Sequence, residues 1–200
     1  GCLDSLVTLA SVAKRAREHH PDLRDLSGRT VLGEGPSDAT WMIVGEAPGA
    51  DEDTAGRPFV GRAGRLLTGM MLDAGFDRAE VYITNLVKRR PPENRNPNRV
   101  EIAASSAVLN DEIAAVGPLV VTPLGNVPTQ HLLGRDVRIS DAQGRWFAWQ
   151  GRWVFPLFHP AFLLRNARME DGSPRARTAA ALRELKGLLK AGAIQPPKGE

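Results

Sequence analysis

At residues 41–49 the chain reads Trp41-Met42-Ile43-Val44-Gly45-Glu46-Ala47-Pro48-Gly49. The four apolar residues at its start predict a short buried strand, because a continuous apolar run bounded by turn residues is typical of strands covered on both faces. The run ends at a glycine, and the Gly- and Asp-rich sequence after it predicts a loop extending to Gly61. Strands of this kind occur in sheets whose strands alternate with helices.

Helices and strands do alternate on both sides of this stretch. Apolar residues at helical spacing predict helices at residues 3–13, 66–74, 102–116, 127–133 and 182–189. Short apolar runs predict further strands at residues 81–84, 119–122 and 153–158, the last preceded by a hairpin partner at 146–149. This order predicts an α/β fold in three layers, α/β/α, with a central, mostly parallel, four-stranded sheet. No internal repeat or linker divides the sequence, so we expect residues 1–200 to form a single domain.

The composition is that of a globular protein, since 42% of the 200 residues are hydrophobic. No apolar run approaches the roughly 20 residues that cross a bilayer, and residues 1–17 lack the apolar core and cleavage site of a signal peptide. The lone Cys2 excludes an internal disulfide and a cysteine-based metal cluster. We therefore expect a cytoplasmic, monomeric protein with no membrane partner.

Basic residues gather at two places in the sequence. The first group is Lys88, Arg89, Arg90, Arg95 and Arg99, and the second is Arg165, Arg168, Arg175 and Arg177. The net charge is only +3, which is compatible with nucleic-acid binding, but the position of the charge matters more than its sum.

Polar or Gly-rich residues lie directly after each predicted core strand. In α/β folds, ligands bind beyond the carboxyl ends of the strands. The residues at those places are Gly45–Gly49, Asn85, Leu124-Gly125 and His159-Pro160. Glycine and proline there are also ordinary turn formers, and for Gly125 that reading has equal weight. Turn formation does not explain why Glu46, Asn85 and His159 occur together.

Motifs around these strand ends closely resemble family 4 uracil-DNA glycosylases. They are Gly45-Glu46-Ala47-Pro48-Gly49, Gly56-Arg57-Pro58-Phe59-Val60-Gly61-Arg62-Ala63-Gly64, Thr84-Asn85-Leu86-Val87-Lys88, Arg90-Pro91-Pro92 with Asn94-Arg95, and His159-Pro160-Ala161-Phe162-Leu163-Leu164. The similarity keeps its order and spacing from about Val31 to Arg165. It implies an enzyme that acts on uracil-containing DNA, flips uracil out of the stack and hydrolyses its N-glycosidic bond, leaving an abasic site.

One feature departs from that family, whose members typically hold an iron–sulfur cluster on four cysteines. The corresponding positions here are Arg17, His20, Arg89 and Ser105, and none of them is a thiolate ligand. The pair His19-His20 is expected to lie at the surface rather than to bind a metal. We therefore expect no cofactor and no metal site, with packing or salt bridges replacing the cluster.

The resemblance implies roles for three residues that hold the base. Phe59 corresponds to the residue that stacks on flipped uracil. Asn85 corresponds to the amide that pairs with uracil O4 and N3–H, a pattern that cytosine does not match. His159 corresponds to the motif histidine beside uracil O2, where a donor stabilises the negative charge of the departing base. The alternatives are a core phenylalanine, a turn asparagine and a histidine that caps the turn before Pro160.

The same resemblance implies roles for other pocket residues. Glu46 is the carboxylate expected nearest the glycosidic bond, where it positions water, stabilises the cationic sugar or instead braces the loop through backbone N–H groups. Ala47 stands where better-known relatives place an aspartate, and Gly45 and Ala47 are expected to border uracil. Glu52 corresponds to the wall near uracil C5 that excludes the methyl group of thymine, although a solvated loop acid is an alternative.

DNA contacts are expected from both basic groups. Leu163 has the spacing of the apolar wedge that fills the vacated stack in related enzymes. The residues expected to hold phosphates are Lys88, Arg90, Arg95 and Arg165.

Two other functions remain open on sequence alone. One is a catalytically weak protein that binds uracil or nucleic acid and has lost activity together with the cluster. The other is a nucleotide-binding α/β protein, which is disfavoured because no Walker-type loop and no Gly-x-Gly-x-x-Gly occurs after a strand.

Overall fold

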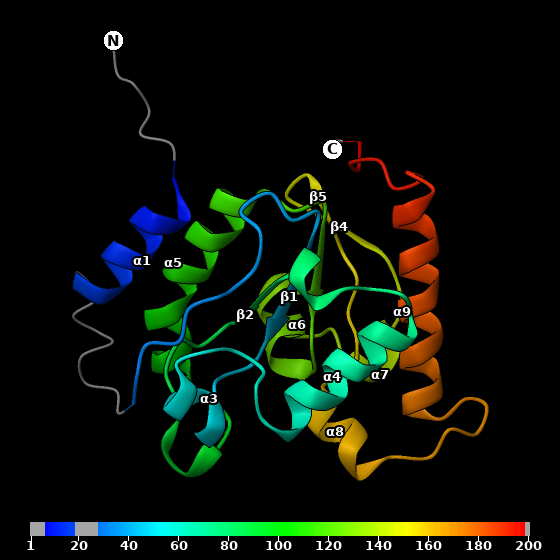
Figure 1. Cartoon of the computed structure of the whole chain (residues 1–200), viewed down its shortest axis with the longest axis horizontal. Helices are drawn as coiled ribbons and strands as arrows, with labels where there is room; N and C mark the ends of the chain where they lie inside the picture. The colour runs from blue at the N-terminus through cyan, green and yellow to red at the C-terminus, as the bar shows by residue number, and fades with distance from the viewer. Residues whose placement is uncertain (1–6, 19–27, 199–200) are drawn as a thin grey trace.

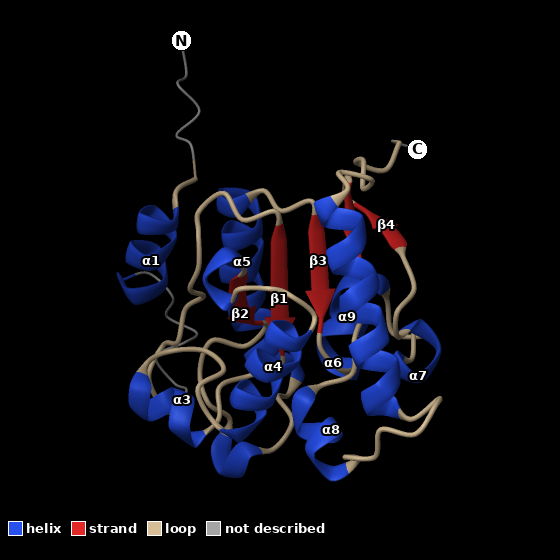
Figure 2. Ribbon diagram, turned by 45° about the vertical axis from the view of Figure 1, so that its right-hand side comes forward, coloured by secondary structure: helices blue, strands red, loops and turns tan. Residues whose placement is uncertain are grey.

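The computed structural model describes residues 7–18 and 28–198, and the side chains of residues 17 and 18 are left out of that description. Its elements, in chain order, are α1 (Leu9–Glu18), β1 (Trp41–Gly45), α3 (Ala50–Ala55), α4 (Arg62–Asp73), η1 (Arg78–Glu80), β2 (Tyr82–Asn85), η2 (Pro92–Asn94), α5 (Arg99–Val116), β3 (Val120–Pro123), α6 (Asn126–Leu133), α7 (Ile139–Ala142), β4 (Phe147–Trp149), β5 (Arg152–Val154), α8 (Pro160–Arg165) and α9 (Pro174–Lys190). Figures 1 and 2 show a central sheet with helices on both faces, which confirms the predicted α/β/α layering.

The sheet has the strand order β2-β1-β3-β5-β4. The first four of these strands are parallel, and β4 pairs antiparallel with β5 at the edge. The predicted number of four strands is therefore one too few, because the hairpin partner joins the same sheet. The tight turn between β4 and β5 brings β4 back alongside β5. Its central residues, Gln150 and Gly151, adopt the positive φ values, 46° and 72°, that such hairpin turns require.

The two faces of the sheet support separate parts of the core. On β1, Trp41 and Ile43 pack with apolar side chains of α4 and α9, whereas Met42 and Val44 pack with those of α5. This is the alternation that a pleated strand imposes on neighbouring side chains. The strand is buried on both faces, as its uninterrupted apolar sequence predicts. Helix α1 lies outside α5 and forms a small third cluster with it.

The ends of the helices set the loops that border the site. Helix α5 begins at a capping box in which Asn98 and Glu101 bond each other's backbone N–H groups, and it ends at Gly117 with φ 63°. The predicted opening helix at residues 3–13 lies partly outside the described residues, and its described counterpart is α1. No helix in the described part of the chain is long and apolar enough to span a membrane.

A segment before β1 runs alongside β2. Glu34 and Ile83 exchange two backbone hydrogen bonds, 2.9 and 2.8 Å long, and the Val31 N–H donates to the Lys88 carbonyl at 2.7 Å. Residues 31–34 therefore fix the outer edge of the strand that ends at Asn85.

Candidate active site

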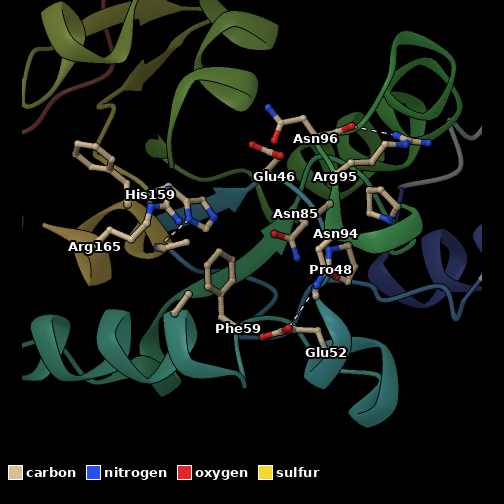
Figure 3. Close-up of a pocket in the computed structure, with 16 residues that line it drawn as sticks. Glu46, Pro48, Glu52, Phe59, Asn85, Asn94, Arg95, Asn96, His159 and Arg165 are labelled. Carbon is tan, nitrogen blue, oxygen red and sulfur yellow. Dashed lines mark hydrogen bonds between the residues drawn. The ribbon is translucent and has the colours of Figure 1, made fainter.

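The carboxyl ends of the parallel strands open into a cavity of about 420 Å³ (Figure 3). It is lined by Glu46, Ala47, Pro48, Gly49, Glu52, Phe59, Ala63, Asn85, Pro91, Asn94, Arg95, Asn96, His159, Ala161, Phe162 and Arg165. Most of the predicted site residues are thus brought together. The polar strand ends were the signal that located them, because parallel strands place their carboxyl ends at one edge of the sheet.

Asn85 lies at the floor of this cavity, and the residue is only 3% exposed. Gly45 is its register partner on β1, and a Cβ atom at Gly45 would collide with both the Asn85 Oδ1 atom and the Phe59 ring. The Asn85 side-chain amide makes no hydrogen bond to any other residue in the described part of the chain. Its oxygen and its NH₂ group are therefore both free to pair with a base edge.

Phe59 borders the same floor, with its ring centroid 6.0 Å from that of His159. The residue is 6% exposed, and its backbone has φ 52°, which is uncommon for a bulky side chain. Gly64 packs directly under the Phe59 backbone, where a Cβ atom would collide with the Phe59 carbonyl. The loop is therefore shaped around this aromatic ring.

His159 is the N-cap of α8, and its Nδ1 atom accepts the Ala161 N–H at 3.0 Å. Burial lowers the pKa of His159 to about 4, helped by the positive charge of Arg165 and opposed by Glu52. The imidazole is therefore neutral near pH 7. Because Nδ1 is an acceptor, the single proton sits on Nε2, which makes that nitrogen a hydrogen-bond donor.

Glu46 and His159 border a second cavity of about 560 Å³ as well as the first. Burial raises the pKa of the Glu46 carboxyl. Gly125 lies in this second cavity with φ 87°, and a Cβ atom there would come within 3.1 Å of the His159 Cβ. Gly125 therefore allows the close approach of His159, in addition to forming a turn.

Glu52 is the carboxylate that braces the loops. It accepts the backbone N–H groups of Gly49, Val60 and Gly61 at 3.1, 2.9 and 2.8 Å. Glu52 is therefore a half-buried carboxylate bonded to the loop backbone, and not a solvated loop acid. The bracing role considered for Glu46 belongs to Glu52 in this structure.

The prediction that Lys88 holds a DNA phosphate is wrong, because its side chain is fully buried. Its Nζ atom donates to the Asn85 carbonyl at 2.6 Å, to Thr84 Oγ1 at 2.7 Å and to the Glu112 carboxylate. Burial lowers the pKa of Lys88, and the Glu112 charge opposes that effect. The partner comes from α5, so no local sequence signal distinguishes Lys88 from its half-buried basic neighbours Arg89 and Arg90.

The prediction that Leu163 is a wedge is also wrong. Leu163 is 1% exposed and belongs to the core shared by α4 and α8. The short helix α8 turns this residue inward, whereas Phe162 remains partly exposed and lines the cavity.

The arginines near the cavity differ in how they are held. Arg95 makes two bonds with Glu101, 2.8 and 2.7 Å long, although Arg95 remains 43% exposed. Arg90 donates to Asn94 Oδ1 at 2.7 Å, and Arg165 is exposed at the rim. The loop residues Asn94 and Asn96 also line the cavity. Asn94 belongs to a motif that carries the family resemblance but was assigned no role, and Asn96 has no distinctive sequence signal.

Of the residues at the cluster positions, the two whose side chains the structure describes, Arg89 and Ser105, do not fit an iron–sulfur group. Ser105 is fully buried, and its Oγ atom accepts the Lys88 N–H at 3.1 Å. Arg89 donates from Nε to Thr30 Oγ1 at 3.1 Å. His20 and the side chain of Arg17 lie outside the described residues, as do His19 and Cys2. The described part of the chain holds no group of three or more His, Cys, Asp or Glu side chains able to bind a metal ion.

Comparison with known proteins agrees with this arrangement. The model of the Uracil DNA glycosylase superfamily matches residues 32–186. The type-4 uracil-DNA glycosylase of Thermotoga maritima is 44% identical over 142 residues, which cover 70% of this chain and 74% of that protein. The type-4 enzyme of Archaeoglobus fulgidus is 36% identical over 159 residues, covering 75% and 79%. The predicted resemblance is confirmed, and the chain belongs to the type-4 family of the uracil-DNA glycosylase superfamily.

Proposed function

We propose that this protein excises uracil from DNA by hydrolysing the N-glycosidic bond, and that the cavity at the strand ends is its active site. The observation that carries this proposal is the free amide of Asn85, which faces the same cavity as the Phe59 ring and the neutral His159. Cavities of about 300–1,000 Å³ are typical of small-ligand sites, and this one is of that size.

Base selection depends on the Asn85 amide. Its oxygen accepts uracil N3–H, and its NH₂ group donates to uracil O4. Cytosine presents an acceptor at N3 and a donor at C4, so an amide held in this one orientation could form neither bond and buried polar atoms would be left unpaired. Phe59 holds the base by stacking. The wall formed by Pro48 and Glu52 is the part of the cavity that we assign to excluding the methyl group of thymine.

Bond cleavage separates charge, with the positive end on the sugar and the negative end on uracil. The Nε2–H group of His159 meets the negative charge that develops at uracil O2. No proton transfer from His159 is required, because the neutral imidazole acts as a hydrogen-bond donor. The Glu46 carboxylate faces the sugar side, where it stabilises the cationic sugar and orients the attacking water.

DNA contacts in this proposal come from Arg95 and Arg165, which line the cavity, and from Arg90, which is bonded to the lining residue Asn94. We further propose that the protein acts as a cytoplasmic monomer. We also propose that activity needs no iron–sulfur cluster. Purified protein is expected to be colourless and free of stoichiometric iron.

The test is incubation with a single-uracil oligonucleotide, after which alkali cuts the abasic sites. We expect cleavage at the uracil position and none in matched oligonucleotides that carry cytosine or thymine. Asn85→Asp is the matched variant. It preserves the size and shape of the side chain but cannot donate to uracil O4, so we expect weaker uracil recognition. Binding without cleavage by the unmodified protein would support the alternative of a catalytically weak uracil-binding protein and would overturn this proposal.

A further inference from the structure

The backbone of the loop that carries Phe59 is held in a costly conformation. Left-handed φ at a bulky residue persists only where the surroundings hold it in place. Phe59 has φ 52°, and it comes directly after Pro58, whose own φ is restricted by its ring. The aromatic side chain itself makes no polar contact that fixes the backbone. Glu52 holds the Val60 and Gly61 N–H groups that follow it, and other groups are needed to hold the Pro58 and Phe59 carbonyls.

Arg78 of η1 supplies those groups. Its Nη1 atom donates to the Phe59 carbonyl at 3.0 Å and to Thr68 Oγ1 at 2.9 Å. Its Nη2 atom donates to the Pro58 carbonyl at 2.7 Å and to Glu34 Oε1 at 3.1 Å. The four N–H groups on the two Nη atoms therefore have one acceptor each, in the fixed planar geometry of a guanidinium.

Glu34 connects this clamp to the other base-holding residue. Its backbone pairs with Ile83, which lies two residues before Asn85 on β2. The Glu34 carboxylate also accepts two bonds from Arg57, 2.8 and 3.1 Å long. The Phe59 loop is thus tied to the edge of the strand that ends at Asn85.

We propose that Arg78 is a positioning residue for uracil binding. Its guanidinium holds the Pro58 and Phe59 carbonyls, and thereby sets the place of the Phe59 ring relative to the Asn85 amide. Arg78 does not line the cavity, so it acts through Phe59 and not on the base. This inference rests on the proposed function, in which Phe59 stacks on uracil.

The perturbation is Arg78→Met, which keeps a side chain of similar length and removes every donor. The measured quantity is the inhibition constant of free uracil in the uracil-release assay, because free uracil reports on the base pocket without DNA. We expect this constant to rise about 5- to 150-fold, the factor that corresponds to the usual cost of holding one residue in a left-handed backbone conformation. Arg78→Lys keeps the charge but cannot serve both carbonyls at once, so we expect an intermediate rise. If Arg78→Met does not fold, the inhibition constant is measured on Arg78→Lys instead.

Two comparisons separate positioning from general stability. In a Phe59→Leu background, Arg78→Met should change the inhibition constant less than about twofold, because the ring on which it acts is gone. Arg57→Met is the matched control, since Arg57 also bonds Glu34 but donates to neither carbonyl. It should leave the constant within about twofold of the parent value.

An unchanged inhibition constant in folded Arg78→Met protein would overturn the inference, and so would an equal effect in the Phe59→Leu background. The unmodified protein is the reference for the function itself. If it releases no uracil, the proposed function and this inference both fail. If it releases uracil, is inhibited by free uracil and is matched by the Arg78 variants, only the inference fails.

Discussion

Removal of the buried ammonium by Lys88→Met should destabilise the protein strongly. The Lys88 and Glu112 side chains are 0% and 1% exposed, so no water replaces the missing ammonium. Among the described residues, Glu112 then keeps the neutral donors Gly33 N–H, Tyr82 O–H and Thr84 O–H. Breaking a buried ion pair on one side costs about 3–5 kcal/mol, which is a large part of the roughly 5–15 kcal/mol that holds a typical domain. For a chain of this length, that loss corresponds to a fall in Tm of roughly 6–20 °C.

Urea unfolding monitored by tryptophan fluorescence measures this cost. Lys88→Met combined with Glu112→Gln should be more stable than Lys88→Met alone, because the amide oxygen still accepts the Gly33 N–H and no charge remains buried. Arg15→Met is the control. Arg15 of α1 forms an exposed ion pair with Asp111, the neighbour of Glu112 on α5, and its loss should cost less than about 1 kcal/mol. A cost for Lys88→Met no larger than that of Arg15→Met would refute the reasoning. A shallower salt dependence of DNA binding in folded Lys88→Met would restore the phosphate role that burial argues against.

The remaining predictions concern the cavity and its rim. His159→Ala should slow single-turnover uracil release by about a hundredfold or more, and Glu46→Gln should slow it less; the reverse order would make the carboxylate the main catalytic group. The free energy of unfolding should fall as the pH drops from 6.5 to about 4, because over this range His159 binds a proton in the unfolded chain but not in the folded one. His159→Gln should flatten that dependence in a pH series of denaturation curves. Changing Arg90, Arg95 and Arg165 together to Gln should reduce the log–log salt slope of duplex binding by about 0.9 for each phosphate that the variant no longer neutralises, and an unchanged slope would place the phosphate path elsewhere.

The strand ends were predictable because they depend on local sequence and a general property of parallel sheets. The apolar run at residues 41–44 predicts a buried strand, and the residues directly after such parallel strands must gather at one edge. Lys88 and Leu163 were not predictable, because their burial depends on distant partners. Glu112 lies 24 residues after Lys88 in the sequence, and the inward rotation of Leu163 is set by the packing of α8 against α4. Motif spacing identifies positions along a chain but does not establish which side of a short helix faces the core.

The close packing around Gly45 has a consequence for redesigning the enzyme. The Asn85 amide and the Phe59 ring both approach the place that a side chain at this position would occupy. Any substitution at Gly45 would push both groups away together. The depth of the base pocket is therefore set by the main chain and cannot be changed gradually by side chains of increasing size at this position. Attempts to broaden base choice should instead begin at Pro48, which lines the cavity but makes none of the hydrogen bonds by which Glu52 braces the loops.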